Sequence, residues 1–247
     1  MPPHKGGRHT GHRPPPFSRE IVILFEDDAV VAVDKPAGLP AVPIPNSSAP
    51  SALAILSEEM KRQRQRALVV HRIDRFTSGV LLFAKTHTSR DVLIKQFLKH
   101  TPVRQYLAVV RGRVAEKEGK LVDHLRRDGM FQKASRESDP EAARAELSYS
   151  VERPLRDATL VRVRLVTGFQ NQIRVQFAAA GHPVIGDRKY RAEEAAETRI
   201  ARVALHAALL EFTHPKSGET VRIESPLPPD MRSLVSALSR KDRAPAG

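Results

Sequence analysis

Short apolar runs separated by Pro, Gly or acidic residues recur along the chain, and they predict many strands. The runs 21–25 and 29–33 flank the acidic triplet 26–28, which predicts a hairpin. A continuous apolar run over 80–84 follows the turn-forming sequence Thr77-Ser78-Gly79, so it predicts a buried strand. Alternating or β-branched segments predict further strands at 104–112, 121–126, 131–134, 143–151 and 159–166.

Apolar residues at helical spacing are confined to a few segments. Ser51 is a suitable N-cap for a helix reaching about residue 65, and a second helix is predicted over 89–100. A short helix is also predicted from 229 to about 238. The inner face of the second predicted helix consists of Val92, Leu93, Phe97 and Leu98.

Many consecutive strands with few helices between them predict an α+β fold, with a mixed, largely antiparallel sheet and flanking helices. No internal repeat or second linker divides the chain, so one domain is expected over 20–238. Residues 1–19 contain basic residues, no acid and the run Pro14–Pro16, which predicts a basic disordered tail. A second basic tail is expected over 239–247. The tail at 1–19 is expected either to touch phosphates or only to increase solubility.

Composition narrows the class of function. A formal net charge of +13 predicts a polyanionic partner, most often nucleic acid. No apolar run approaches the roughly 20 residues that span a bilayer, so no membrane partner is expected. The absence of cysteine excludes disulfides, thiolate zinc sites and cysteine nucleophiles. No phosphate-binding glycine loop and no paired metal-binding histidines occur, so neither a cofactor nor a metal is expected.

The strongest candidate chemistry is the segment 71–79, which reads HRIDRFTSG. Asp74 lies between Arg72 and Arg75, and a nearby guanidinium lowers a carboxylate's pKa. An aspartate that stays ionised in a dry pocket is a nucleophile or a base. From these residues alone, a surface salt bridge in a basic loop is an equally good interpretation.

The segment 71–85 closely resembles the signature of RluA-type pseudouridine synthases, which is close to HRLDRxTSG followed by an apolar strand ending in Ala-Lys. Other segments resemble the same family: DKPAGL at 34–39, RQYLA at 104–108, QIRV at 172–175 and GHPVIGDRKY at 181–190. Segments from 204 to 228 resemble its closing hairpin and exit, where His206 is expected to be structural. The resemblance covers about 20–232, with no S4-type RNA-binding domain in front.

The resemblance implies a catalytic set of Asp74, Tyr106 and Arg174. Asp74 would be the nucleophile or base of the ribose step, Tyr106 would stack on the target base and help move a proton, and Arg174 would pair with Asp74. Arg72 is expected to fill the vacated space or hold the flipped nucleotide. The remaining substrate contacts are expected from Arg75, Thr77, Gln172 and Lys35, although a surface lysine beside a turn fits Lys35 equally well.

The implied activity is a cofactor-free conversion of uridine to pseudouridine in a structured RNA. Large-subunit ribosomal RNA and transfer RNA are both open, and a cytoplasmic monomer is expected. The alternative is a non-catalytic RNA-binding or ribosome-assembly protein on the same fold. It is motivated by departures from the family pattern around Arg174: Phe169, Gln170, Asn171 and Gln176 replace Arg, Thr, His and His.

Overall fold

The computed structural model describes residues 20–129, 131–190 and 199–239. The tail predicted at 1–19 and all but the first residue of the tail predicted at 239–247 therefore lie outside the described residues. Within this part of the chain, eleven strands form one sheet. The strands are β1 (Val22–Glu26), β2 (Val30–Lys35), β3 (Leu68–Val69), β4 (Ser78–Ala84), β5 (Val103–Arg111), β6 (Glu118–Asp128), β7 (Phe131–Ser135), β8 (Ala143–Pro154), β9 (Ala158–Leu165), β10 (Leu205–Thr213) and β11 (Thr220–Glu224).

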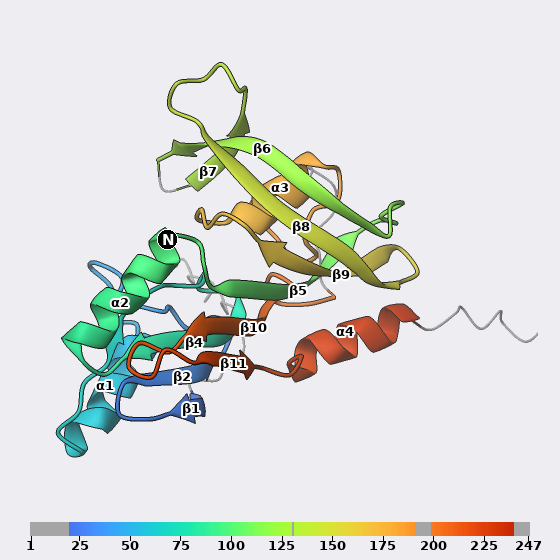
Figure 1. Cartoon of the computed structure of the whole chain (residues 1–247). Helices are drawn as coiled ribbons and strands as arrows, with labels where there is room; N and C mark the ends of the chain where they lie inside the picture. The colour runs from blue at the N-terminus through green and yellow to red at the C-terminus, as the bar shows by residue number, and fades with distance from the viewer. Residues whose placement is uncertain (1–19, 130, 191–198, 240–247) are drawn as a thin grey trace, which may run out of the picture.

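The main path through the sheet is β1-β2-β4-β10-β5-β9-β8-β6-β7, with β3 on β4 and β11 on β10. Only the pairing of β10 with β4 is parallel among the described strands. Figure 1 shows β5 and β10 in the middle of the molecule, with β6, β7 and β8 above them and β1, β2 and β4 below. The predicted α+β fold with a mixed, largely antiparallel sheet is therefore confirmed.

Four helices accompany the sheet in the described residues: α1 (Ala52–Arg62), α2 (His87–Leu98), α3 (Gln172–Ala179) and α4 (Pro229–Ser239). Ser51 caps α1 as predicted, because its side chain accepts a hydrogen bond from the backbone N–H of Ala54. Ser239, which the sequence assigned to the C-terminal tail, is the last residue of α4.

Two local predictions were wrong. The turn expected at 77–79 lies earlier, at Arg75 and Phe76, because Ser78 and Gly79 already pair with neighbouring strands. Leu98, expected on the inner face of its helix, is 73% exposed at the end of α2, and Leu93 is the fully buried residue of that helix.

The central strands place Lys35, Gly79, Ala207 and Tyr106 opposite one another, on β2, β4, β10 and β5. Residues directly opposite in neighbouring strands project to the same face of a sheet. Gly79 has φ +111, and a Cβ added there would lie 2.1 Å from the carbonyl oxygen of Ala207. The glycine therefore permits the close approach of β4 and β10 beneath this face.

Alternate residues of β2 and β4 bury against different helices. Val33 and Leu81 pack with Leu56 of α1 in one cluster, whereas Ala32 and Leu82 pack with Leu93 of α2 in another. Because Lys35 and Gly79 share the parity of Val33 and Leu81, their row lies on the α1 face of the sheet.

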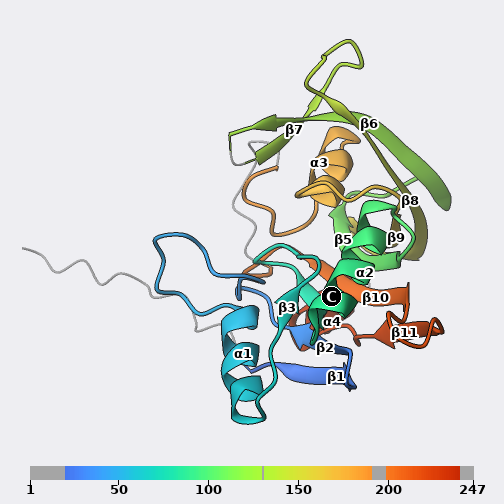
Figure 2. The same ribbon diagram turned by 60° about the vertical axis from the view of Figure 1, so that its left-hand side comes forward.

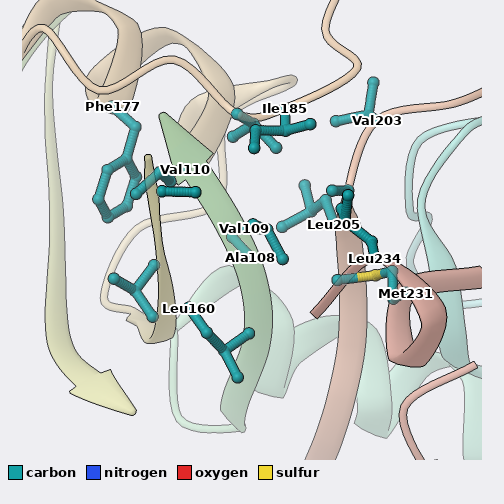
Figure 3. Close-up of a cluster of buried hydrophobic side chains, with 14 of the residues drawn as sticks. Ala108, Val109, Val110, Leu160, Phe177, Ile185, Val203, Leu205, Met231 and Leu234 are labelled. Atoms are coloured by element: carbon teal, nitrogen blue, oxygen red, sulfur yellow. The ribbon is translucent and has the colours of Figure 1, made fainter. Parts of the chain in front are cut away.

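The largest apolar cluster lies around β5, β9 and β10 (Figure 3). Helix α3 contributes Phe177, which meets Tyr149 of β8 edge to face, with ring centroids 5.7 Å apart. Tyr149 continues the row of Tyr106 through Val163. Helix α3 therefore covers the same face of the sheet as Tyr106, and it carries Arg174 towards that face.

Candidate active site

The loop that carries Asp74 is fixed to the turn after β2. The backbone N–H of Gly38 donates to the carbonyl of Arg75 at 2.8 Å, and Arg75 Nε donates to the carbonyl of Gly38 at 2.9 Å. Asp74 itself accepts a backbone hydrogen bond from Thr77. These contacts fix the backbone around Asp74, and the charge of its carboxylate influences the pKa of both Lys35 and Tyr106.

Lys35 is part of this anchor. Its side chain is fully buried, and Nζ donates to the carbonyls of Pro36, Leu39 and Arg75 at 3.0, 2.8 and 3.1 Å. Burial lowers its pKa to about 7, although the charge of Asp74 acts in the opposite direction. The interpretation as a surface lysine is wrong, and direct contact with the substrate does not fit a buried ammonium whose three donors are all used.

Asp74 lies in an environment with opposing electrostatic effects. Burial raises the pKa of its carboxyl, and the charges of Arg174, Arg72 and Lys35 partly offset that rise. The side chain is still 23% exposed, so it is accessible from solvent. Arg75, the other arginine that flanks Asp74 in the sequence, donates from Nε to the Gly38 carbonyl and is not among the largest influences on the pKa of Asp74.

Arg174 faces Asp74 but is held more tightly by another aspartate. The distance from Arg174 Nη1 to Asp74 Oδ2 is 3.8 Å, whereas Arg174 Nε and Nη2 donate to Asp187 at 2.7 and 2.9 Å. Asn171 accepts from Arg174 Nη1 at 2.7 Å. The predicted pairing of Arg174 with Asp74 is therefore present as a loose contact, and two unpredicted residues fix the guanidinium.

The backbone explains why Asp187 reaches this position. The segment before it pairs with the end of β5, since Ile185 donates to Val109 and Arg111 donates to Pro183. Gly186 has φ +78, and a Cβ there would lie 1.9 Å from the carbonyl of Arg202. The glycine lets the chain turn tightly, so that the buried carboxylate of Asp187 points at Arg174.

Tyr106 completes the predicted set. Burial raises the pKa of its phenol to about 12, and the negative charge of Asp74 contributes to the rise while Arg104 opposes it. The phenol is therefore protonated at neutral pH. Its ring is suited to stacking on a base, and its O–H is a hydrogen-bond donor rather than a ready proton acceptor.

Two of the other predicted substrate contacts, Gln172 and Thr77, are buried, whereas Arg75 is exposed. Gln172 is 2% exposed; its Oε1 accepts from Thr167 and Phe169, and its Nε2 donates to Glu146 and Gln176. Thr77 is also 2% exposed. Both residues support the site from below the surface, whereas Arg72 is exposed beside Asp74 and is placed to meet a substrate.

The departures from the family pattern have structural consequences around α3. Gln176 is fully buried and donates from Nε2 to Leu121, Asp123 and Ala145, tying α3 to β6 and β8. Phe169 packs against a small apolar cluster that includes Val175. Asn171 has a left-handed backbone with φ 56 and binds Arg174. At these positions the chain has uncharged contacts where the family pattern carries Arg and His.

Two histidines near the site are structural. His71 stacks on Phe97, its Nε2 accepts from the N–H of Leu82 at 3.0 Å, and burial lowers its pKa to about 3. His206 is fully buried between Ser78 and the carbonyl of Ser225, as predicted. His206 fixes the start of β4 at Ser78, and His71 binds the middle of the same strand at Leu82.

Replacing Asp187 with Asn is expected to loosen Arg174 and to lower the pKa of Asp74. The negative charge of Asp187 raises the pKa of Asp74, so its removal acts downwards. The acid limb of the rate profile should move to lower pH, and stability should fall by about 2–3 kcal/mol because a charged hydrogen-bond pair is lost. Steady-state rates across pH and urea denaturation measure both effects.

Asp230→Asn is the matched control, because Asp230 holds Arg202 through the same two-pronged contact at 2.8 Å. It should reduce stability without moving the acid limb. An unchanged acid limb in Asp187→Asn would contradict the assigned electrostatic role.

No group of three or more potential metal-binding His, Cys, Asp or Glu side chains occurs in the described residues. No helix in these same stretches is long and apolar enough to cross a membrane. A cleft of about 520 Å³ is lined by residues including Gln105, Arg162 and Arg164, and it contains none of the predicted site residues.

The fold places Asp74, Arg174 and Tyr106 on one face of the sheet, and comparison with known proteins shows which class of enzymes has this sequence. The family model described as RNA pseudouridylate synthase matches residues 29–179, and the chain belongs to this family. The resemblance drawn from the sequence is thus confirmed, and the chain is an RNA pseudouridine synthase.

Individual members of the family are similar to this chain over most of its length. The chain is 36% identical over 229 residues to ribosomal large subunit pseudouridine synthase C of Pasteurella multocida, covering 89% of this chain and 68% of the relative. It is 37% identical over 240 residues to ribosomal large subunit pseudouridine synthase D of Xanthomonas campestris, covering 91% and 71%. The solved structure of human RNA pseudouridylate synthase domain containing 4 has the same fold, with a TM-score of 0.74, 21% identity and coverage of 88% and 92%.

Proposed function

We propose that this enzyme converts uridine to pseudouridine in large-subunit ribosomal RNA, with Asp74, Tyr106 and Arg174 as its catalytic residues. The single observation that supports these residues most directly is the approach of Arg174 to a partly buried but accessible Asp74. The choice of RNA is supported by the names of the relatives from Pasteurella multocida and Xanthomonas campestris.

The reaction is an isomerisation, so no atom is gained or lost. The bond between ribose C1′ and base N1 breaks, the base turns, and C1′ joins C5. The proton that leaves C5 is balanced by the proton that N1 carries in the product. Before these steps the uridine leaves its stack, which costs a few kcal/mol.

Asp74 acts in the ribose step as an ionised carboxylate, either by attack at C1′ or by removing a ribose proton. Arg174 favours that ionised form across a distance of 3.8 Å. Tyr106 supports the turning base with its ring, and its protonated phenol donates a hydrogen bond. Arg72 lies exposed beside Asp74, where it holds the flipped nucleotide or fills its place in the RNA.

A monomer suffices for this proposal, because one chain supplies all the named residues. A ribosomal substrate supports the proposal that the enzyme works in the cytoplasm. The strongly cationic composition suits a polyanionic substrate, since phosphate contacts provide much of the affinity for RNA.

A pseudouridine-specific chemical map of ribosomal and transfer RNA tests the proposal. The map would compare cells with the gene, cells without it, and deleted cells carrying the Asp74→Asn variant. We expect one or a few pseudouridines of large-subunit RNA to vanish on deletion, to return with the wild-type gene and to stay absent with Asp74→Asn.

Loss of a transfer RNA site instead would overturn the choice of substrate but keep the catalytic assignment. Full restoration of the ribosomal site by Asp74→Asn would overturn the role of Asp74. Persistence of every site, together with inactivity of the purified enzyme on unmodified transcripts of both RNAs, would overturn the activity and favour the RNA-binding alternative.

A further inference from the structure

Phe131 is an exposed aromatic side chain at the start of β7. Only Phe76 and Phe131 are aromatic among the exposed large hydrophobic side chains of the described residues, at 38% and 42%. Phe76 follows Asp74 by two positions in the sequence. A cation covers each ring, Arg75 over Phe76 and Lys189 over Phe131. In a chain without tryptophan and with 5% aromatic residues, an exposed phenylalanine in a basic setting suggests a ligand.

Phe131 is connected to the catalytic arginine through one short turn. Asp187, which holds Arg174, also accepts hydrogen bonds from the backbone N–H groups of Lys189 and Tyr190 at 2.9 and 3.1 Å. The Arg174 guanidinium lies 5.1 Å from the Tyr190 ring, and Lys189 Nζ lies 5.3 Å from it. The same carboxylate thus positions both the guanidinium and the lysine that touches Phe131.

Tyr190 also ties this turn to the hairpin that carries Phe131. Its hydroxyl donates to the carbonyl of Gln132 at 2.9 Å and accepts from Asn171 Nδ2 at 3.4 Å. Figure 2 shows the β6–β7 hairpin and α3 together in the upper part of the molecule, on the far side of β5 from α1. The aromatic ring is therefore held at a fixed place relative to Arg174, one residue from a backbone anchor.

The chemistry of this patch suits a nucleobase. An exposed cation–π contact is worth only about 0.5–1 kcal/mol, so the pair alone gives little reason to leave a phenylalanine in water. A base stacked on an aromatic side chain is worth about 1–3 kcal/mol, whatever its sequence. Lys189 lies over the ring, and its cation can bind a phosphate that accompanies a base. Lys133, two residues along β7, adds a second cation near the ring and is paired with Asp128.

We infer that Phe131, flanked by Lys189, is the stacking surface for a nucleobase adjacent to the target uridine. On binding, the base takes the place of the lysine on the ring, and the lysine turns to a neighbouring phosphate. The uridine is thereby held from two sides, at Asp74 and through the nucleotide beside it. This inference rests on the proposed function, because the patch is defined by its position next to Arg174.

The absence of native tryptophan allows a direct binding test. Phe131→Trp introduces one tryptophan at the patch, and Val122→Trp introduces one at a 47% exposed position on β6 as the control. With single-stranded oligouridylate as the probe, we expect quenching of the tryptophan at 131 and little at 122, at equal RNA occupancy by gel shift. Equal or absent quenching at 131 under full occupancy would overturn the inference.

Activity on large-subunit RNA transcripts gives a second readout. Phe131→Ala should lower kcat/KM by about 5- to 100-fold, mostly through KM, because the stacking energy is lost before the chemical step. Phe131→Tyr should restore it, and Val122→Ala should leave it unchanged. A Phe131→Ala enzyme within twofold of wild type would overturn the inference while leaving the catalytic assignment intact.

Failure of the proposed function has a different signature. An inactive wild-type enzyme on all RNA transcripts would overturn both the proposed function and the inference. Light scattering of Phe131→Ala and wild type at equal concentration tests the remaining alternative: loss of self-association on substitution would assign the patch to a second copy of the chain and overturn its role in RNA binding.

Discussion

Asp74→Asn is expected to abolish pseudouridine formation while leaving the fold and the affinity for RNA intact. Asparagine fills the same space, but it is neither a nucleophile nor a base, so the ribose step loses its reactive group. Removal of a catalytic nucleophile or base lowers kcat by about 10⁴-fold or more. Release of tritium from C5-labelled uridine in an RNA transcript measures the rate, and a filter-binding assay measures the affinity.

The pH dependence of the wild type provides an independent check on Asp74. In the proposed reaction its carboxyl acts in the ionised form, and burial raises its pKa above that of an ordinary aspartate. Activity should therefore fall as the pH drops through that raised value, at a higher pH than an exposed aspartate would give. Asp91→Asn, at a 58% exposed position on α2, is the control and should match wild type throughout. Residual turnover of more than a few per cent in Asp74→Asn would assign the ribose step to another group.

Much of the fold follows from local patterns. Strand β4 is buried along its whole length, and β5 contains the apolar run 107–110, so nearby sequence indicates both strands. The turn before β4 was misplaced because Ser78 and Gly79 suit a turn locally, and their pairing with His206 and Ala207 is a contact more than 120 positions away. Propensity is overridden where a distant strand supplies the hydrogen bonds.

Some residues of the candidate site could be predicted from local sequence, and others could not. Asp74, Tyr106 and Arg174 were predicted because they lie in long, specific motifs, and in the structure the charge of Asp74 acts on both other side chains. Asp187 lies within a segment that resembles the family, yet nothing local indicates that its carboxylate reaches back 13 positions to Arg174.

Burial at the site was harder to predict than proximity. Lys35 and Gln172 carry polar groups typical of substrate contacts, but these groups bind carbonyls and amides of the protein itself. Whether a polar side chain faces a cleft or supports its floor depends on the loops folded over it, and sequence periodicity does not report those loops.

Lys35→Met is expected to weaken the enzyme through the position of Asp74. Methionine keeps the length of the side chain but leaves the carbonyls of Pro36, Leu39 and Arg75 without their donor. Each unsatisfied buried group costs about 1–3 kcal/mol, so the loop that carries Asp74 should shift or loosen. A displacement near 1 Å lowers the rate by about 100-fold, and we expect that loss in kcat with little change in KM.

The pH dependence of activity should move in a defined direction. Below pH 7 Lys35 is protonated, and its charge lowers the pKa of Asp74. Its removal therefore raises the pKa of Asp74 and shifts the acid limb of the rate profile to higher pH, opposite to the shift expected for Asp187→Asn. Lys35→Arg keeps the charge and should keep the acid limb near its wild-type position even if its rate is reduced.

The buried Lys35 also makes the folding stability depend on pH. The pKa of Lys35 is about 7 in the folded protein and 10.5 as its ordinary value, so the unfolded chain binds more protons between these limits. The cost of burying the charge is fully present below pH 7 and is relieved as the pH rises. The free energy of unfolding of wild type should rise by about 2–3 kcal/mol relative to that of Lys35→Met between pH 7 and 9, measured by urea denaturation.

Lys85→Met is the control, because it removes a lysine that is paired with Glu26 at the far end of β4. The comparison of wild type with Lys85→Met should show neither this rise in stability nor a shifted acid limb. A Lys35→Met enzyme with wild-type kcat and an unshifted acid limb would show that the buried lysine does not position Asp74.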